Sequence, residues 1–331
     1  MKYWNKLIPA AVLLLILTSC SSSTSSTGQS EKTIKWKMGH ISDANHIWNK
    51  TALRFAELVK EKTDGKIEID VYPNSQLGGE TDTLNSIKGG TVDLTITGET
   101  MQNWAPKTAL LAVPYAIENE EHLNRVINGK VGREIEKDIK ENLGATPLFY
   151  MQRAPRNLTS NKPIKTPEDL KGFSMRVPNV PLFMNAWEKA GAKPQVMDLS
   201  EVFTGLQQHV IQGQENPYDL IYSSGLYEVQ KYANETEHVY SWIYVIIGND
   251  QYNELTEDLK AEVQEAAKEA QAYGDQLFQK EIAQYKQKLI DEGMEINTEV
   301  DKKAFQKAML PAIKETLSKE QYDLYKEMIN E

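Results

Sequence analysis

The sequence predicts an α/β protein with two lobes, and two observations support this expectation. Strand-like and helix-like segments alternate from Ile34 to about residue 213, which is the pattern of helices layered on a mainly parallel sheet. Helical apolar spacing then continues for about 35 residues in the C-terminal third. About 300 residues follow the N-terminal segment, and this length suits one large domain or two medium ones.

The first set of elements begins with a strand at 34–40 (IKWKMGH). A helix follows, with Trp48 and Phe55 on one apolar face, and it is expected to end near Gly65. Apolar and polar residues alternate along 66–73 (KIEIDVYP), as they do in a strand with one buried face. A short helix near 80–88 and a strand at 92–98 (VDLTITG) complete this set.

The second set repeats the pattern without visible sequence repetition. Strands are expected at 145–152 and at 173–178, and a helix is expected at 180–191. An extended segment at 193–198 precedes a helix at 200–213, which opens on the capping residue Ser200. Two sets of α/β elements in one chain favour two lobes over one.

The long helix is expected between Leu255 and Leu289. At 1.5 Å per residue it would reach roughly 50 Å, which is longer than one small domain is wide. A coiled-coil seam is the alternative, but apolar heptads are not sustained elsewhere. We therefore expect a strut that lies across both lobes.

The N-terminus has the features of an export signal. Lys2 and Lys6 precede an apolar run that is too short to span a bilayer comfortably, so residues 1–19 are predicted to be a signal peptide. The LTSC sequence resembles a bacterial lipobox, which predicts cleavage before Cys20 and lipid attachment to it; a signal-anchor helix is the alternative. Residues 20–33 are rich in Ser and Thr and predict a flexible tether.

Charge and cysteine content exclude several classes of protein. Removal of residues 1–19 lowers the basic side chains from 37 to 35 and leaves 47 acidic ones. This acidic body argues against a nucleic-acid partner and against a polybasic membrane contact. With one cysteine, an internal disulfide is impossible and a cysteine-based metal or catalytic site is not expected.

Catalytic signatures are absent from the sequence. None of GxSxG, GxxxxGK[ST], HExxH or CxxC occurs, and no two of the five histidines have the spacing of a helical metal site. We therefore expect no enzyme activity, no metal and no cofactor. An enzyme acting on an organic acid stays open as an alternative.

Two arginines are candidates for binding an anion. Arg176 lies between Met175 and Val177 in a strand, so its side chain points away from the face that those two residues bury. Near the C-terminal end of a strand this direction opens onto the usual ligand crevice, and a guanidinium fits a carboxylate. An ordinary surface or interdomain salt bridge is the alternative. Arg156 is the second candidate.

The segment GQENP (213–217) admits two interpretations. Asn216 before Pro217 is typical of a polar turn, and position alone favours that interpretation over a functional one. On the functional interpretation, either Glu215 is a catalytic acid or an amide of the segment is aimed at a ligand.

The order of the motifs IEIDVYPNSQLGG, RNLTSN, MRVPN, SEVFTGLQ and GQENP resembles the solute-binding proteins of tripartite ATP-independent periplasmic (TRAP) transporters. The resemblance covers nearly all of the chain from Ile34. It implies a two-lobed α/β fold like that of periplasmic binding proteins, with a ligand cleft between the lobes and a long C-terminal helix spanning both. It implies that Arg176 clamps a ligand carboxylate, that Asn216 donates to it and that Arg156 adds a second cation. Glu215 becomes a support for the backbone or for Arg176.

Further candidates for lining the ligand site lie near strand ends that face the expected cleft. These residues are His40, Glu99, Trp104, Asp198 and Trp242. The acids would repel a second carboxylate but accept hydrogen bonds from hydroxyls, so we favour a hydroxylated monocarboxylate such as a uronate, an aldonate or a sialic-type acid. A C4-dicarboxylate is the alternative ligand.

The resemblance also implies an organisation and partners. Lobe I is expected at 34–153, completed by part of 242–331, and lobe II at 154–241, with C-terminal helices at 254–331 bracing both. We expect a monomer outside the cytoplasm that is held to the membrane only by its lipid and hands its ligand to the integral membrane subunits of a transporter. The Ser-rich tether slightly favours a Gram-positive outer face over a periplasm. A surface receptor for signalling is the alternative role.

Overall fold

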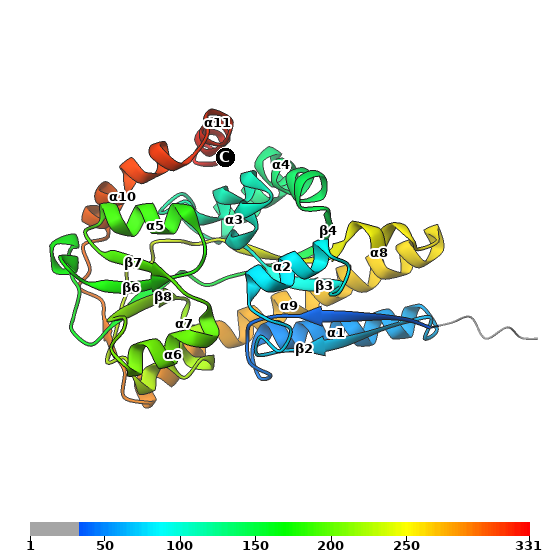
Figure 1. Cartoon of the computed structure of the whole chain (residues 1–331), viewed down its shortest axis with the longest axis horizontal. Coiled ribbons are helices and arrows are strands. Elements are labelled where there is room, and N and C mark those ends of the chain that lie inside the picture. Colours follow the sequence, from blue (N-terminus) through cyan, green and yellow to red (C-terminus); the bar gives the residue numbers. More distant parts are fainter. Residues whose placement is uncertain (1–32) are drawn as a thin grey trace, which may run out of the picture. The chain divides into compact units, whose positions relative to one another are not determined.

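The computed structural model describes Thr33–Glu331, and these residues form two β-sheets with helices packed around them (Figure 1). The predicted signal peptide, Cys20 and the tether up to Lys32 lie outside the described residues. The first sheet has the order β2 (Ile67–Tyr72), β1 (Ile34–Gly39), β3 (Leu94–Thr97), β10 (Trp242–Gly248) and β4 (Ala145–Gln152). The second sheet has the order β11 (Glu295–Asn297), β9 (Tyr232–Asn234), β5 (Asn157–Ser160), β8 (Gly213–Asn216), β6 (Ser174–Val177) and β7 (Lys193–Val196).

Helices occupy most of the chain between the strands. The α-helices are α1 (Ile47–Lys62), α2 (Glu80–Lys88), α3 (Glu120–Asn128), α4 (Lys130–Asp138), α5 (Pro181–Lys189), α6 (Leu199–Gln207), α7 (Tyr218–Ser223), α8 (Asn249–Asn253), α9 (Glu257–Asp291), α10 (Lys302–Thr316) and α11 (Lys319–Met328). Short turns of other helix types are η1 (Glu99–Asn103), η2 (Pro106–Ala112), η3 (Ile139–Leu143), η4 (Pro167–Leu170) and η5 (Leu226–Glu228). The predicted alternation of strands and helices is therefore confirmed.

Both sheets are mainly parallel, as expected, but each contains one antiparallel strand, β10 in the first sheet and β5 in the second. In the first sheet β1 runs parallel to β2 and β3, but β10 is antiparallel to β3 and β4. In the second sheet β5 is antiparallel to β8 and β9. The chain passes from β4 to β5 and from β9 to β10 without a helix. A strand that arrives this way does not follow the helical crossover that keeps neighbours parallel.

The segment GQEN is a buried strand and not a turn. β8 pairs with β5 on one side and with β6 on the other, and all four of its residues are buried. The helix expected at 200–213 ends earlier, at Gln207. Two residues later His209 adopts a left-handed φ of 58°, which does not continue a helix. A Cβ on Gly213 would lie 2.3 Å from the Thr159 carbonyl oxygen, so glycine permits the close approach of β5. β8 thereby holds the side chains of GQEN at fixed positions inside the second sheet.

Strand β10 ties the first sheet to both hydrophobic cores. All seven of its residues are buried, and they alternate between two core clusters: Trp242, Tyr244 and Ile246 pack in one, and Ile243 and Val245 pack in the other. This alternation follows from the two-residue period of a strand covered on both faces. The elements that carry the functional residues are therefore built on a rigid centre.

The predicted long helix is α9, which has 35 residues. It begins at Glu257 and is capped by Thr256, whose hydroxyl accepts a hydrogen bond from the Leu259 amide at 3.3 Å. α9 contacts α1 and β4 beside the first sheet and α7 and β11 beside the second (Figure 1). The expectation of one helix that spans both lobes is confirmed.

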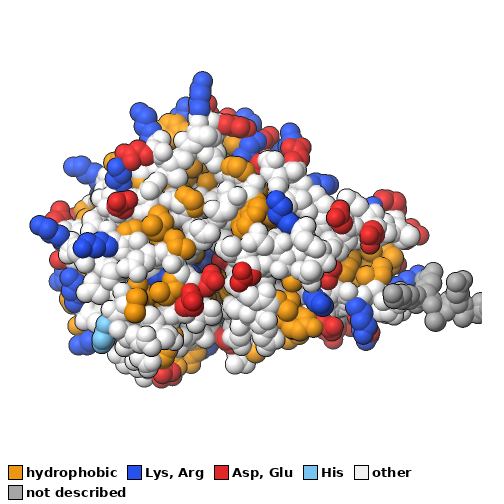
Figure 2. Space-filling view, in the orientation of Figure 1, with side chains coloured by type: hydrophobic (Ala, Val, Ile, Leu, Met, Phe, Trp, Pro, Cys, Tyr) orange, Lys and Arg blue, Asp and Glu red, His pale blue; other side chains and the backbone are white. Residues whose placement is uncertain are grey.

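The surface carries both signs of charge. Figure 2 shows acidic and basic side chains interspersed over the viewed face, without a large basic area. Within Thr33–Glu331, every helix is too short or too polar to cross a membrane.

Candidate ligand-binding site

Arg176 lies on β6 and points into a cavity between the two sets of elements. Its neighbours Met175 and Val177 are fully buried in the core on the other side of the strand, as the strand period predicts. The Arg176 side chain is only 5% exposed. Its Nε donates to the Met197 carbonyl oxygen at 2.7 Å.

The two terminal nitrogens of Arg176 have no carboxylate partner among the described residues. Burial lowers the pKa of Arg176 to about 10, although the charge of Glu215 acts in the opposite direction. The group therefore stays a cation at neutral pH. A buried cation with two free donor groups is poorly compensated, and an anionic ligand relieves this.

Arg156 is held in place by the residues of β8. Its Nη2 donates to Glu215 Oε1 at 2.7 Å and to Asn216 Oδ1 at 3.1 Å, and its Nε pairs with Glu215 Oε2. Burial acts against the charge of Arg156, but the adjacent Glu215 raises its pKa above the ordinary value. Arg156 is thus a permanent cation whose position is fixed by a bidentate ion pair.

Glu215 has the environment of a structural carboxylate. The side chain is fully buried, and besides Arg156 it accepts a hydrogen bond from His238 Nε2 at 2.9 Å. Burial alone would raise the pKa of Glu215, but the charge of Arg156 and the hydrogen bonds lower it to about 2. Sequence reasoning expected Glu215 to support the backbone or Arg176, whereas its direct partner is Arg156.

Asn216 ends β8 beside the same cavity. Its Oδ1 accepts from Arg156, and its Nδ2 donates to Gln214 Oε1 at 2.6 Å. An amide nitrogen carries two hydrogens, so one donor of Nδ2 remains. Asn216 and Arg176 both line the cavity.

Glu99 belongs to the same group of charged residues. Arg153 Nη1 donates to both carboxyl oxygens of Glu99 at 2.7 Å, and Arg156 Nη1 lies 3.4 Å from Oε1. Arg153 was missed by the sequence analysis. The sequence RAPR (153–156) carries a second arginine three residues before Arg156, where the chain crosses from β4 to β5, and this repetition could have indicated Arg153.

Glu80 is the second residue that the sequence analysis missed. It is the first residue of α2, and its two carboxyl oxygens accept hydrogen bonds from Thr97 Oγ1 at 3.0 Å and Thr100 Oγ1 at 3.1 Å. Burial, and then the nearby charge of Glu99, raise the pKa of Glu80. The ETD sequence that starts α2 resembles an ordinary helix start and gave no signal of a site.

The other candidates from the sequence lie in different surroundings. His40 is buried and bonded to Asn49 and Ser42, and burial lowers its pKa to about 4. Asp198 is half-buried at the cavity mouth, and burial raises its pKa. Neither Trp104 nor Trp242 lines the cavities described here, and Trp242 is fully buried in the core.

The cavity has two parts. The first cavity, about 20 Å³, is lined by charged groups together with Ile41, Trp48, Leu199 and Leu220. The second cavity, about 10 Å³, shares Glu80 and Arg176 with the first and extends to Asp198. These volumes suit about one water molecule each, so the side chains are closely packed in this conformation.

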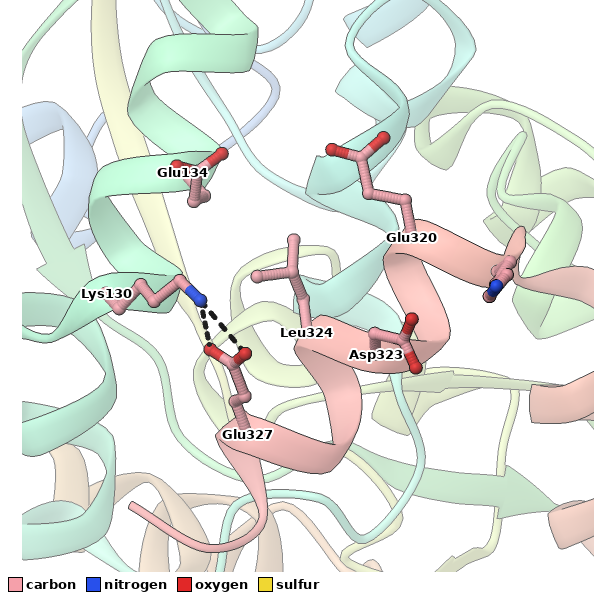
Figure 3. Close-up of a pocket in the computed structure, with 7 residues that line it drawn as sticks. Lys130, Glu134, Glu320, Asp323, Leu324 and Glu327 are labelled. Atoms are coloured by element: carbon pink, nitrogen blue, oxygen red, sulfur yellow. Dashed lines mark hydrogen bonds and ion pairs between the residues drawn. The ribbon is translucent and has the colours of Figure 1, made fainter.

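A wider groove of about 540 Å³ lies between α4 and α11 (Figure 3). Leu324 and Glu327 project from α11 toward α4, and Glu327 forms an ion pair with Lys130 at 2.9 Å. The charged side chains that line this groove are solvated surface groups, and ion pairs of this kind contribute little. We therefore place the candidate site at Arg176.

Two mixed sheets, a charged cavity between them and one helix across both define the class of two-lobed bacterial solute-binding proteins. The chain belongs to the family described as bacterial extracellular solute-binding protein, family 7, whose profile matches residues 38–320. The family predicted from MRVPN and GQENP is confirmed.

Similar proteins include members of known structure. A solute-binding protein of Roseobacter denitrificans is 44% identical over 306 residues, which is 92% of this chain and 94% of the relative. A crystal structure of a TRAP periplasmic solute-binding protein from that species, with bound L-galactonate, has a TM-score of 0.88 at 44% identity and covers 90% of this chain and 99% of its own. A TRAP periplasmic solute-binding protein from Xanthobacter autotrophicus, with bound β-D-galacturonate, has a TM-score of 0.85 at 27% identity. The match covers 89% of this chain and 99% of the Xanthobacter chain.

Proposed function

We propose that this protein binds a hydroxylated monocarboxylate, a uronate or an aldonate, and delivers it to the membrane subunits of a TRAP transporter. The observation that carries the proposal is the buried Arg176 guanidinium, whose terminal nitrogens lack a carboxylate partner in Thr33–Glu331. The ligands bound by the Roseobacter and Xanthobacter proteins, L-galactonate and β-D-galacturonate, support this choice of chemistry.

The ligand carboxylate would bind between Arg176 and Asn216. Arg176 offers two parallel N–H donors and a full charge, which together offset the loss of water from a carboxylate. The remaining N–H of Asn216 adds a neutral donor. Arg156, fixed by Glu215, contributes positive potential at the same place. The binding group is thus assembled from β6, β8 and the link between β4 and β5.

The rest of the cavity suits hydroxyl groups better than a second carboxylate. Glu80, Glu99 and Asp198 line it and accept hydrogen bonds from hydroxyls. A second carboxylate would meet these like charges, so a C4-dicarboxylate fits less well. Leu199 and Trp48 provide apolar surface for the carbon skeleton.

Ligand entry would require the two sets of elements to separate. The two cavities of about 20 and 10 Å³ are far too small for a six-carbon acid. Two-lobed binding proteins open and close by hinge motion, and a ligand held by both lobes favours the closed state. The closed, liganded form would be the one that the membrane subunits recognise.

We further propose that Cys20 is lipidated and that the protein is a monomer on the outer side of the cell membrane. The LTSC sequence and the Ser-rich segment after it support the anchor.

A thermal-shift screen of the tether-free protein against organic acids tests the proposal. A ligand at 100 times its Kd stabilises a protein by about 2.7 kcal/mol, which raises its melting temperature measurably. We expect L-galactonate or D-galacturonate to give a shift, succinate to give little, and Arg176→Ala to abolish the shift. Arg176→Lys should restore little, because an ammonium lacks the planar fork. If Arg176→Ala binds the best acid as well as the wild type, the assignment of Arg176 fails.

A further inference from the structure

Two charged side chains of the first cavity lack a partner of opposite charge in the described part of the chain. Arg176 donates only to a carbonyl oxygen, and Glu80 accepts only from threonine hydroxyls. The other charged residues of this cavity form ion pairs: Glu99 with Arg153, and Arg156 with Glu215. A new ion in the cavity would therefore meet Glu80 and Arg176 without having to displace an ion-pair partner.

Glu80 and Arg176 influence each other across the cavity. Both line the first and the second cavity, and burial lowers the pKa of Arg176 while the negative charges of Glu215 and then of Glu80 act to raise it. The pKa of Glu80 is itself raised by burial and by Glu99. The charge of Arg153 and the hydrogen bonds that Thr97 and Thr100 donate act in the opposite direction and favour the ionised carboxylate.

The charged groups around Glu80 come from several elements and carry both signs. They are Glu99 on η1, Arg153 and Arg156 between β4 and β5, Arg176 on β6 and Asp198 before α6. Arg153 and Arg156 already face Glu99 and Glu215. Among the arginines that line this cavity in Thr33–Glu331, Arg176 is the one without a direct ion pair to a carboxylate, although the charge of Glu215 acts on it from further away.

A ligand carboxylate bound at Arg176 changes the charges around Glu80 in two ways. It neutralises the charge of Arg176, and it adds a negative charge to the cavity that Glu80 lines. Both effects disfavour an ionised Glu80, since like charges in a poorly solvated site raise the pKa of a carboxyl group. The threonine hydroxyls suit either state of Glu80, because a hydroxyl donates to a carboxylate and accepts from a carboxylic acid.

We propose that Glu80 takes up a proton when an acid anion binds at Arg176, so that the protein binds the anion together with a proton. The inference rests on the proposed function, which supplies the anion. Protonation leaves the total charge of the cavity unchanged on binding. A neutral Glu80 can then donate its hydrogen to a ligand hydroxyl, which an ionised carboxylate cannot do.

The pH dependence of affinity follows from this coupling. The pKa of Glu80 is higher in the complex than in the free protein, so the complex holds more protons and binding tightens as the pH falls. Between the two pKa values the affinity changes by about tenfold per pH unit, and outside them it is flat. A site without proton uptake has no such slope while the ligand and Arg176 stay ionised.

Isothermal titration calorimetry with L-galactonate and D-galacturonate tests the proposal. At each pH, titrations in two buffers that both buffer at that pH but differ in ionisation enthalpy, such as phosphate and Tris near neutral pH, give the number of protons taken up per ligand. From about pH 5 to about pH 9 we expect this number to reach about one for the wild type. Glu80→Gln should bind with about zero protons. Glu136→Gln is the matched control, because Glu136 also has a pKa raised by burial but does not line the cavities.

Each outcome of this titration has a defined meaning. Binding by the wild type without proton uptake at any pH overturns the proposal, whether or not Glu80→Gln folds. Uptake that persists in Glu80→Gln overturns the assignment to Glu80. Absence of binding by the folded wild type for every sugar acid tested contradicts the proposed function instead.

Discussion

The carboxylate of Asp198 lies against the backbone of Gly79, with its Cγ, Oδ1 and Oδ2 each 2.9 Å from the position that a Cβ on Gly79 would occupy. Gly79 caps α2 beside the first sheet, and Asp198 caps α6 beside the second. A second contact nearby joins Asn103 Nδ2 to the Asn179 carbonyl oxygen at 2.8 Å. These contacts bring the two halves together at the mouth of the cavity.

Replacement of Gly79 by alanine should weaken ligand binding. The backbone of Gly79, at φ −68°, accepts an alanine, but the new methyl group would overlap Asp198 when the cavity is closed. Overpacking of this kind costs about 1 to 3 kcal/mol, so the Kd should rise by about 5-fold to about 150-fold. Calorimetric titration with the best sugar acid measures the change.

Two further variants separate this effect from a loss of helix capping. Gly89→Ala places a Cβ no closer than 3.5 Å to its neighbours, at the other end of α2, and should leave the Kd unchanged. Gly79→Ala should cost less affinity in an Asp198→Ala background than in the wild type, since the clashing carboxylate is gone. An equal cost of Gly79→Ala in both backgrounds would show that Asp198 and Gly79 do not meet in the complex.

Replacement of Glu215 by glutamine should lower the free energy of unfolding, because Glu215 supports Arg156 and does not itself contact the ligand. The variant leaves the buried Arg156 with only the longer contact to Glu99, and breaking a buried pair costs about 3 to 5 kcal/mol. Urea denaturation followed by circular dichroism gives the free energy of unfolding. The control is Glu188→Gln at an exposed position, which should change it by less than about 0.5 kcal/mol. A Glu215→Gln protein as stable as the control would contradict the structural role of the pair.

The pH dependence of stability should report the same ion pair. Glu215 has a folded-state pKa of about 2, below its ordinary value of 4.5. A carboxyl group with a lowered folded pKa stabilises the protein above the unfolded value and loses this contribution as the pH falls toward the folded value. The difference in unfolding free energy between wild type and Glu215→Gln should therefore be constant above about pH 5 and shrink toward pH 2. A difference that grows on acidification would refute this assignment.

Substitution of Cys20 by serine should release the protein from the membrane. The predicted lipid is attached through the thiol of Cys20, which serine lacks. In the variant, the charged N-terminal residues and the apolar run would still direct export, but no lipid would hold the protein to the membrane. Fractionation of cells expressing each version, with labelled palmitate as the second readout, tests this expectation. Retention of Cys20→Ser in the membrane fraction would favour a signal-anchor helix.

The sequence predicted the types of elements well because their patterns are local. The helix of α9 follows from apolar residues repeated along Glu257–Asp291, and the direction of Arg176 follows from its place between Met175 and Val177. The GQEN strand was missed because its four residues lack the apolar alternation of a strand. Its pairing with β5 and β6 comes from the tertiary fold, which overrides the turn preference of Asn and Pro.

The sequence by itself determined the α/β class, the long helix and the candidate cation at Arg176, since these depend on short-range periodicity and on one motif. Only the tertiary structure decided which charges meet. Arg156 takes Glu215 as its partner, Arg153 takes Glu99, and Glu80 and Arg176 are left without a partner of opposite charge within the described residues. Pairings of this kind join residues far apart in the chain, and burial then makes the choice of partner decide the charge state of each group.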